Sequence, residues 1–327
     1  MRRIRSGRLW AALEVAACLL LLVAAWRATA GMQAGWPLAE RSAAPAAAGF
    51  PRTVPDYGGD AVRLAGPPSR IASQALVTDH FLFGVVSPSR IAAVSAVAHD
   101  SRYSYVADTL AGMDVGVVDD VEALLRRRPD LLVVSHTARA DLVALARNAG
   151  IPTVRLLTVF EDFDQIARGL ATVGRLTGEE GAAEREIARF RERIAAAVAR
   201  KPAGAPPLRA LVYVALSGTF GAGSLFDHIL TELGAVNVAA EHGIGPHGAI
   251  SGEQIAAWNP DWIIADAPAG EEDAMRRRLL DQPGVAVTVA GRTGQILVLD
   301  HRRFITMSQH AAEPVEAVAA ALYPDAP

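Results

Sequence analysis

Two stretches of the chain share one pattern: Glu122-Ala-Leu-Leu-Arg-Arg-Arg-Pro129-Asp130-Leu-Leu-Val-Val134 and Glu253-Gln-Ile-Ala-Ala-Trp-Asn-Pro260-Asp261-Trp-Ile-Ile-Ala265. In each, a glutamate begins a short amphipathic helix, a Pro-Asp pair ends it, and an apolar run typical of a buried strand follows. The two stretches lie 131 positions apart. The sequence therefore predicts two α/β lobes built on one plan, with a ligand between them, because binding pockets favour such interfaces.

Composition indicates a folded protein of about two domains. The chain has 327 residues, of which 51% are hydrophobic and 20% are charged, so there is enough apolar material for two cores. The formal net charge of −3 gives no whole-chain attraction to nucleic acid. We therefore expect no nucleic-acid partner.

Residues 1–30 are typical of a signal peptide. Four arginines precede an apolar run from Leu9 to Trp26, and Ala28-Thr29-Ala30 offers a cleavage site. An uncleaved membrane anchor is the alternative, because the apolar run is about as short as a spanning helix can be. Cys18 is the only cysteine and lies in this segment, so the exported protein can have no internal disulfide. We expect a periplasmic or otherwise extracytoplasmic protein.

The rest of the chain divides by pattern. Residues 31–68 are rich in Ala, Pro and Gly and are expected to form a linker, with folded structure beginning near Arg70. Strand-type and helix-type segments then alternate, which predicts α/β lobes with parallel sheets. The expected N-terminal lobe spans 69–158, the connecting helices span 159–201 (Asp162 to Arg175 and Glu179 to Ala199), and the C-terminal lobe spans 202–327.

The chain resembles the solute-binding proteins of ABC importers for iron-siderophores, haem and cobalamin. The resemblance covers roughly Arg70 to Tyr323. It rests on the two repeated units and on four further motifs, which occur in the family's order: Pro68-Ser-Arg-Ile-Ala-Ser73, Pro88-Ser-Arg-Ile-Ala-Ala-Val-Ser95, Ala149-Gly-Ile-Pro152 and Phe220-Gly-Ala-Gly-Ser-Leu225.

The resemblance implies a monomer of two lobes joined by a rigid interdomain helix, holding a small ligand for delivery to an ABC permease in the cytoplasmic membrane. It implies no catalysis and no cofactor, with an iron chelate or haem as cargo. The sequence agrees, since it contains no G-x-S-x-G, Walker or H-E-x-x-H motif. By the same resemblance Glu122 and Glu253 dock on the permease, although each glutamate would also favour its helix N-terminus.

Ligands of open α/β sheets sit beyond the C-terminal ends of the strands. Arginines there suit the carboxylates of haem or of a ferric chelate, and His247 or Tyr103 is a candidate axial haem ligand. The loops at these ends supply the candidate binding residues: Gln74, His99, Arg102, Tyr103, His136, Phe220, His247, His301, Arg302 and Arg303.

Three alternatives stay open. For cobalamin, Gly116 and His247 stand where the resemblance implies tryptophans. A bare divalent metal would require a shell drawn from His99, His136, His247 and Asp300. A redox enzyme on a similar scaffold is the third alternative, and it could not hold an iron–sulfur cluster through thiolates, because no cysteine follows Cys18.

Overall fold

The computed structural model describes residues 49–118, 121–214 and 218–324. Contacts divide the chain into Met1–Ala47 and Ala48–Pro327, and the description below concerns the second unit. The predicted signal peptide therefore lies outside the described residues. Within those residues, no helix is both long enough and apolar enough to span a bilayer.

The first lobe is built on a parallel sheet of order β5-β4-β3-β6-β7. Its strands are Ile71–Ser73, Ile91–Val94, Gly116–Val117, Leu131–Ser135 and Thr153–Leu156 for β3 to β7. β6 is buried along its whole length, as expected for a strand covered on both faces. The helices of this lobe are α2 Leu76–Val85, α3 Ala107–Leu110, α4 Val121–Arg126 and α5 Ala140–Asn148, with the 3-10 turns η1 Pro88–Arg90 and η2 Ala96–His99.

Folded structure begins earlier than the sequence predicts. The expected linker contains an antiparallel hairpin of β1 (Arg52–Pro55) and β2 (Ala61–Leu64), so the start predicted near Arg70 is wrong. Alternation of buried and exposed residues along β2 is the strand signal that the surrounding Gly and Pro residues obscured. The hairpin is fixed to α5 because Arg147 bonds Asp60 Oδ2 at 2.8 Å and Asp56 Oδ2 at 3.0 Å.

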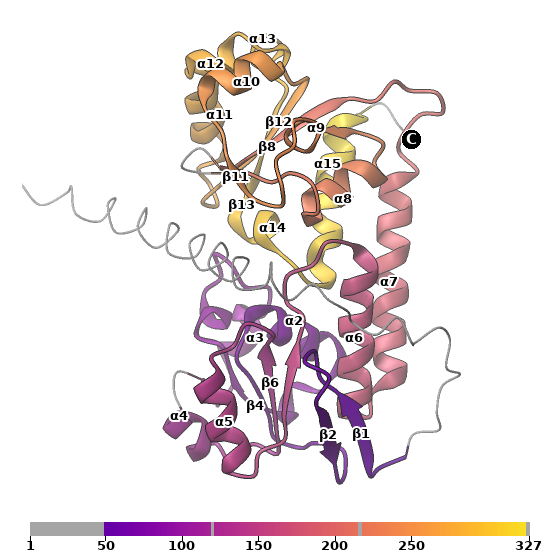
Figure 1. Ribbon diagram of the computed structural model, residues 1–327, viewed down its shortest axis with the longest axis vertical. Coiled ribbons are helices and arrows are strands. Elements are labelled where there is room, and N and C mark those ends of the chain that lie inside the picture. The colour runs from indigo at the N-terminus through magenta and orange to yellow at the C-terminus, as the bar shows by residue number, and fades with distance from the viewer. Residues whose placement is uncertain (1–48, 119–120, 215–217, 325–327) are drawn as a thin grey trace, which may run out of the picture. The chain divides into compact units, whose positions relative to one another are not determined.

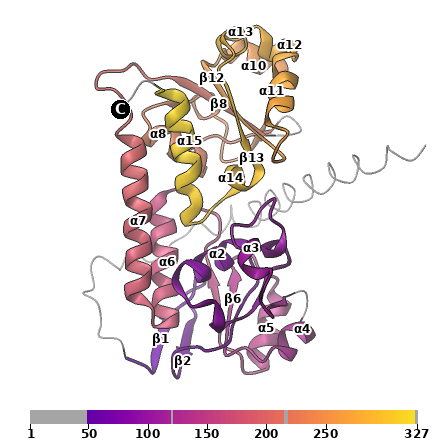
Figure 2. The ribbon, with the colours of Figure 1, turned by 180° about the vertical axis from the view of Figure 1, so that it is seen from behind.

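Two antiparallel helices, α6 (Phe163–Thr177) and α7 (Glu180–Val198), follow the first lobe. Gly178 ends α6 in the left-handed conformation, at φ 76°, which glycine adopts without strain. α7 contacts α2 of the first lobe and α15 (Ala312–Leu322) of the second (Figures 1 and 2). Two helices in series therefore follow the first lobe, and α7 packs on elements of both lobes.

The second lobe has a six-stranded sheet containing the path β11-β9-β8-β12-β13, with β10 also paired to β8. The strands β8 to β13 are Arg209–Val214, Gly218–Thr219, Val236–Asn237, Gly248–Ala249, Trp262–Ala267 and Ile296–Asp300. β8, β10, β12 and β13 pair in parallel, whereas β9 pairs antiparallel with β8 and β11. The α/β class is confirmed, and this sheet is mixed because β8 returns directly through β9.

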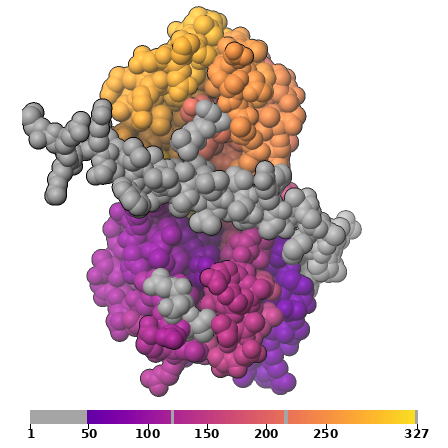
Figure 3. Space-filling model, turned by 60° about the vertical axis from the view of Figure 1, so that its left-hand side comes forward, coloured from indigo at the N-terminus to yellow at the C-terminus, as the bar shows by residue number. Residues whose placement is uncertain are grey.

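Short helices surround the second sheet, and the two lobes occupy separate regions of the surface seen in Figure 3. One apolar cluster includes Leu132 and Leu124 in the first lobe, and another includes Ile263 and Leu279 in the second. The helices are α8 Leu225–Glu232, α9 Val238–Glu241, α10 Gly252–Trp258, α11 Glu272–Leu280, α12 Pro283–Ala286, α13 Val289–Thr293 and α14 His301–Ile305, with η3 Gln309–Ala311 before α15.

The repeated Pro-Asp units fold alike. The residue before each proline has a positive φ, 46° at Arg128 and 47° at Asn259, which turns the chain out of the helix. The aspartate that follows then bonds the residue that precedes or begins the neighbouring strand. Asp130 Oδ1 accepts from Arg70 N at 2.8 Å, and Asp261 Oδ2 accepts from Arg209 N at 2.9 Å.

The side chains of Arg70 and Arg209 add a second hydrogen bond that is the same in both units. Arg70 donates to the Arg127 carbonyl at 2.6 Å, and Arg209 donates to the Trp258 carbonyl at 2.8 Å. Each guanidinium thus satisfies a carbonyl left free near a helix C-terminus. The repeat in sequence is therefore a repeat of one strand–helix junction, once in each lobe.

Candidate ligand site between the lobes

The candidate site is built from loops at the C-terminal ends of parallel strands. Gln74 directly follows β3, His136 follows β6, and His301 follows β13. Open α/β sheets bind their ligands at these ends. A surface depression of about 490 Å³ lies elsewhere, at the N-terminal end of β7, where Arg147 is already paired with two aspartates.

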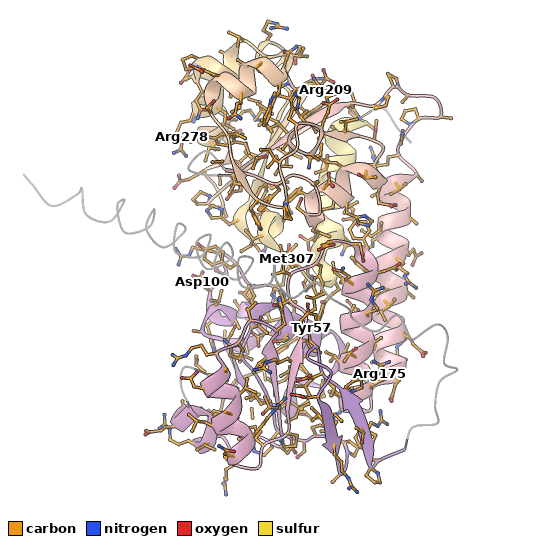
Figure 4. All side chains as sticks on the ribbon, in the orientation of Figure 1. Tyr57, Asp100, Arg175, Arg209, Arg278 and Met307 are labelled. Carbon is orange, nitrogen blue, oxygen red and sulfur yellow. The ribbon has the colours of Figure 1, made fainter. Side chains whose placement is uncertain are left out.

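In the first lobe, the loop after η2 is held by an ion pair. Asp100 accepts from Arg102 at 3.0 Å (Nε to Oδ1) and 2.6 Å (Nη2 to Oδ2), and these bonds lower the pKa of Asp100. The Arg102 guanidinium lies 5.4 Å from the centre of the Tyr103 ring. Asp100 lies on the side of the first lobe that faces the second (Figure 4), and the neighbouring His99 is exposed.

Tyr103 reaches from this loop to the second lobe. Its ring is nearly parallel to that of His301, with a centre-to-centre distance of 6.0 Å and an interplanar angle of 17°. Two residues singled out from separate halves of the sequence therefore face each other. This contact joins the candidate loops of the two lobes.

His301 is held from behind by a carboxylate. Its Nδ1 lies 2.7 Å from Asp266 Oδ2, and the two residues are only 8% and 5% exposed. The strand register explains the pairing, since Asp266 in β12 lies opposite Leu299 in β13, two residues before His301. The other oxygen, Asp266 Oδ1, is buried and has no hydrogen-bond partner among the described residues.

Asp266 was not among the residues predicted from the sequence. A single carboxylate within the otherwise apolar strand Trp262-Ile-Ile-Ala-Asp-Ala267 is the signal that could have found it. A buried charge needs a partner, and His301 directly follows the neighbouring parallel strand, in the Asp300–Arg303 segment from which candidate binding residues were predicted.

A group of largely buried aromatic side chains packs together in the second lobe. Phe220 stacks on Phe226 at 5.8 Å between ring centres and meets His247 edge-on at 4.9 Å, while Phe226 lies 4.7 Å from Phe304. Burial lowers the pKa of His247, so its imidazole is neutral at pH 7. The predicted pair Phe220 and His247 is thus in direct contact.

A second contact between the lobes centres on His80 of α2, which the sequence analysis missed. The His80 Nε2 accepts from Tyr105 N at 3.2 Å, its Nδ1 lies 3.2 Å from Ser308 Oγ, and its carbonyl accepts from Gln309 Nε2 at 2.7 Å. Burial lowers the pKa of His80 to about 3, so the ring is neutral. Nδ1 therefore carries the proton and donates to Ser308.

Tyr105 is fixed on several sides by the second lobe. Its ring stacks on His310 at 4.0 Å and 5°, and its hydroxyl donates to Glu313 Oε2 at 3.0 Å. The guanidinium carbon of Arg302 also lies 4.8 Å from the Tyr105 ring centre. Neither His310 nor Glu313 was predicted, because their neighbours come from the other lobe.

The two predicted arginines differ in their surroundings. Arg302 is half-buried, and its Nε has no hydrogen-bond partner among the described residues. Arg303 is exposed and lies 3.5 Å from Asp300 and 3.4 Å from Glu313. The charge of Arg303 is therefore balanced within the lobe, whereas Arg302 is directed at the contact between the lobes.

Gln74 and His136 lie at other strand ends of the first lobe. The Gln74 side-chain oxygen is buried and lacks a hydrogen-bond partner within the described ranges. His136 Nδ1 accepts from Thr158 N at 3.3 Å, its ring meets Tyr57 at 5.1 Å, and burial lowers its pKa to about 4. His136 is thus a neutral imidazole already engaged by its own lobe.

Glu122 and Glu253 occupy matching places in the repeat. Both are exposed in the first turns of α4 and α10. The N-cap of α10 is made by Ser251 and Gln254, which form a reciprocal capping box. Glu253 therefore takes no part in that cap and leaves its carboxylate at the surface.

No bare-metal shell forms among the residues that the structure describes. Nowhere in the described ranges do three or more His, Cys, Asp or Glu side chains come together in a group that could hold a metal ion. His136 turns to Thr158, and Asp300 caps α14 by accepting from Arg303 N at 3.1 Å. The shell hypothesised from His99, His136, His247 and Asp300 is therefore not assembled.

The periplasmic binding protein family matches residues 71–302, which is well over half of the chain. The chain belongs to this family. The match begins at β3 and ends in α14, so it takes in both sheets and the connecting helices of this periplasmic binding protein.

Known proteins of this kind resemble the chain over most of its length. The cobalamin-binding protein of Halobacterium salinarum is 26% identical over 309 residues, covering 93% of this chain and 83% of that protein. The periplasmic haem-binding protein RhuT of Roseiflexus sp. RS-1 aligns with a TM-score of 0.65 at 23% identity, over 78% of this chain and 98% of that one.

Two further solved structures have the same fold. HutB of Vibrio cholerae, a periplasmic haem-binding protein, gives a TM-score of 0.66 at 19% identity, over 78% of this chain and 99% of that one. A possible iron-binding protein of Staphylococcus epidermidis gives 0.68 at 17% identity, over 79% and 100%. At these identities the structural likeness establishes the fold, and the choice of ligand depends on the residues of this chain.

Proposed function

We propose that this protein is an exported, non-enzymatic binding protein that captures an iron chelate, either haem or a ferric siderophore, between its lobes. The observation that carries the proposal is the facing pair of Tyr103 and His301, which come from different lobes and meet at 6.0 Å. A flat aromatic face and an imidazole at facing loop ends suit a planar or metal-centred ligand.

The surrounding residues support an anionic, partly apolar ligand. Arg302 has an unused buried donor, and a guanidinium binds carboxylates through paired charge-assisted bonds. Tyr103 supplies a flat aromatic face opposite His301. The haem-binding and iron-binding names of several structural neighbours agree with this ligand class.

Cobalamin is the second candidate. It is favoured by the Halobacterium salinarum protein, whose name is cobalamin-binding protein and which is similar to 93% of this chain. Gly116 lies on β5, and the Arg127 side chain packs against its α-carbon. The space that the tryptophan expected for cobalamin would need is therefore taken by Arg127. This observation keeps the iron chelate first.

Delivery to an ABC permease is part of the proposal. Glu122 and Glu253 are exposed on corresponding helices of the two lobes, which suits two-point docking on basic residues of a permease. Exposed ion pairs contribute only about 0–1 kcal/mol each, so we expect the glutamates to set orientation together with the surrounding shape. Export through residues 1–30, with or without retention as an anchor, would bring the protein to this partner.

Direct titration tests the ligand class. Tryptophan fluorescence of the full-length exported protein would be measured against haemin, a ferric siderophore and aquocobalamin. Tyr103→Leu should weaken binding of the preferred iron ligand by about 1 kcal/mol, whereas Phe50→Leu, which alters an aromatic ring lying against Arg52, should not. Binding of aquocobalamin alone would replace the proposed ligand with the second candidate.

A further inference from the structure

His301 is more tightly held than it would need to be if its ring only stacked on a flat ligand. Its ring is buried and fixed by a 2.7 Å hydrogen bond to the buried carboxylate of Asp266. We propose that His301 ligates the metal of a planar tetrapyrrole through Nε2, and that Asp266 is the positioning residue behind it. This inference rests on the proposed function and narrows its substrate class.

The hydrogen bond decides which nitrogen is available. A neutral imidazole with its proton on Nδ1 donates to Asp266 Oδ2 and leaves the lone pair on Nε2. Within the described residues no hydrogen bond engages Nε2 of His301, and the atom is not among the buried, unpartnered ones. The carboxylate also fixes the orientation of the imidazole, as it does behind metal-bound histidines generally.

The cost of Asp266 supports a functional role. A carboxylate in an otherwise apolar strand is expensive to bury, and its Oδ1 has no partner among the residues described. An apolar residue at this position would remove that cost if packing were the only requirement. The pair is therefore better explained as a device that holds an imidazole ready for a ligand.

A single histidine ligand is compatible with only one class of the metal-containing ligands considered above. A bare divalent ion needs several protein ligands, and no group of three candidate ligands occurs in the described ranges. A hexadentate siderophore fills every coordination position of its ferric ion and leaves none for a protein side chain. Haem iron and the cobalt of aquocobalamin each accept an axial imidazole, so the inferred substrate class is a metal tetrapyrrole.

Tyr103 adds to this selection from the opposite lobe. Its ring lies at 17° to the His301 ring, with 6.0 Å between the ring centres. A flat aromatic face near an axial ligand favours a macrocycle over a compact chelate. Haem and corrinoid share this chemistry, and the experiment below separates them.

The test compares ligands with and without a metal. Full-length exported protein would be titrated with haemin, metal-free protoporphyrin IX, aquocobalamin and a ferric trihydroxamate, following absorbance and fluorescence. Asp266→Asn should lose roughly 10- to 100-fold in haemin affinity, which is typical for the partner behind a metal ligand. His301→Ala should lose at least as much, and both variants should bind protoporphyrin IX as the wild type does.

Spectroscopy separates ligation from a structural role. Haemin bound to His301→Ala should have a shifted Soret band, and added imidazole should restore the wild-type spectrum. His242→Gln is the matched control, since His242 is an exposed imidazole stacked on Trp258, and it should leave the haemin spectrum and affinity unchanged. If His301→Ala does not fold, Asp266→Asn supplies the same comparison of haemin with protoporphyrin IX.

Each remaining outcome has a distinct meaning. A shift with aquocobalamin but not haemin would assign the corrinoid within the same class. Haemin affinity and spectrum that are equal in wild type, His301→Ala and Asp266→Asn would overturn this inference and leave the proposed function standing, as would exclusive binding of the ferric trihydroxamate. Failure of the wild type to bind any of these metal ligands would overturn both.

Discussion

Asp79 makes the stability of the first lobe depend on pH in an unusual direction. It lies on α2, is completely buried, and accepts hydrogen bonds from Ser95 N and Oγ. Burial raises its pKa from 3.8 to about 7, despite the opposing bonds from Ser73 and Ser95. The folded protein therefore retains a proton that the unfolded chain releases between about pH 4 and pH 7.

The sign and magnitude follow from linkage. The folded state binds more protons across this interval, so the free energy of unfolding falls as pH rises through it. The contribution of Asp79 to the free energy of unfolding is fully present below about pH 4 and is lost by about pH 7. Each unit of difference between the folded and unfolded pKa corresponds to about 1.4 kcal/mol, so the whole contribution amounts to about 4 kcal/mol. Asp79→Asn should remove this dependence, because the amide oxygen can still accept from Ser95 but cannot ionise.

The assay is urea unfolding of wild type and Asp79→Asn from pH 4 to pH 8. The wild-type minus variant free energy should fall by about 4 kcal/mol over this range. His80 and His310, whose pKa values burial lowers to about 3 and about 4, act in the opposite direction but cancel in the difference. Asp108→Asn, at an exposed position, is the control. A difference that stays constant with pH would refute the reasoning.

Four further variants test the fold, the docking surface and the site. Asp130 accepts from Ser69 N, Ser69 Oγ and Arg70 N, so Asp130→Ala should lower the free energy of unfolding by about 1–3 kcal/mol. Asp261→Ala, which loses fewer bonds, should cost less in the same urea assay. Replacing Glu122 and Glu253 together by Ala should abolish ligand-stimulated ATPase activity of the permease with unchanged ligand affinity, and an equal loss of affinity would contradict docking. Arg302→Ala should weaken an anionic chelate by about 1.5–3 kcal/mol in fluorescence titrations, and a neutral ligand much less.

The repeated units made the fold predictable. Helix, Pro-Asp turn and apolar strand are local features, and the structure shows them as α4 to β6 and α10 to β12. The β1–β2 hairpin was missed because its strands are four residues each and lie among Gly and Pro. The antiparallel strands β9 and β11 were missed for a similar reason, since each has two residues.

The candidate site was predictable only as a set of loops. The rule of C-terminal strand ends found Tyr103 and His301, which the structure brings face to face. It could not find Asp266, which lies inside a strand, or His80 and Glu313, which lie on helices and acquire their partners from the opposite lobe. Such contacts depend on how two lobes meet, and no local pattern in the sequence records that.

The central claim is that an iron chelate is held between the lobes. Native mass spectrometry of the exported protein, isolated from the cells that make it, with absorbance recorded on the same sample, tests this claim most directly. We expect a bound mass containing iron, together with a Soret band for haem or a broad charge-transfer band for a ferric siderophore. A bound cobalt corrinoid with no iron species, or a bare divalent ion, would contradict it.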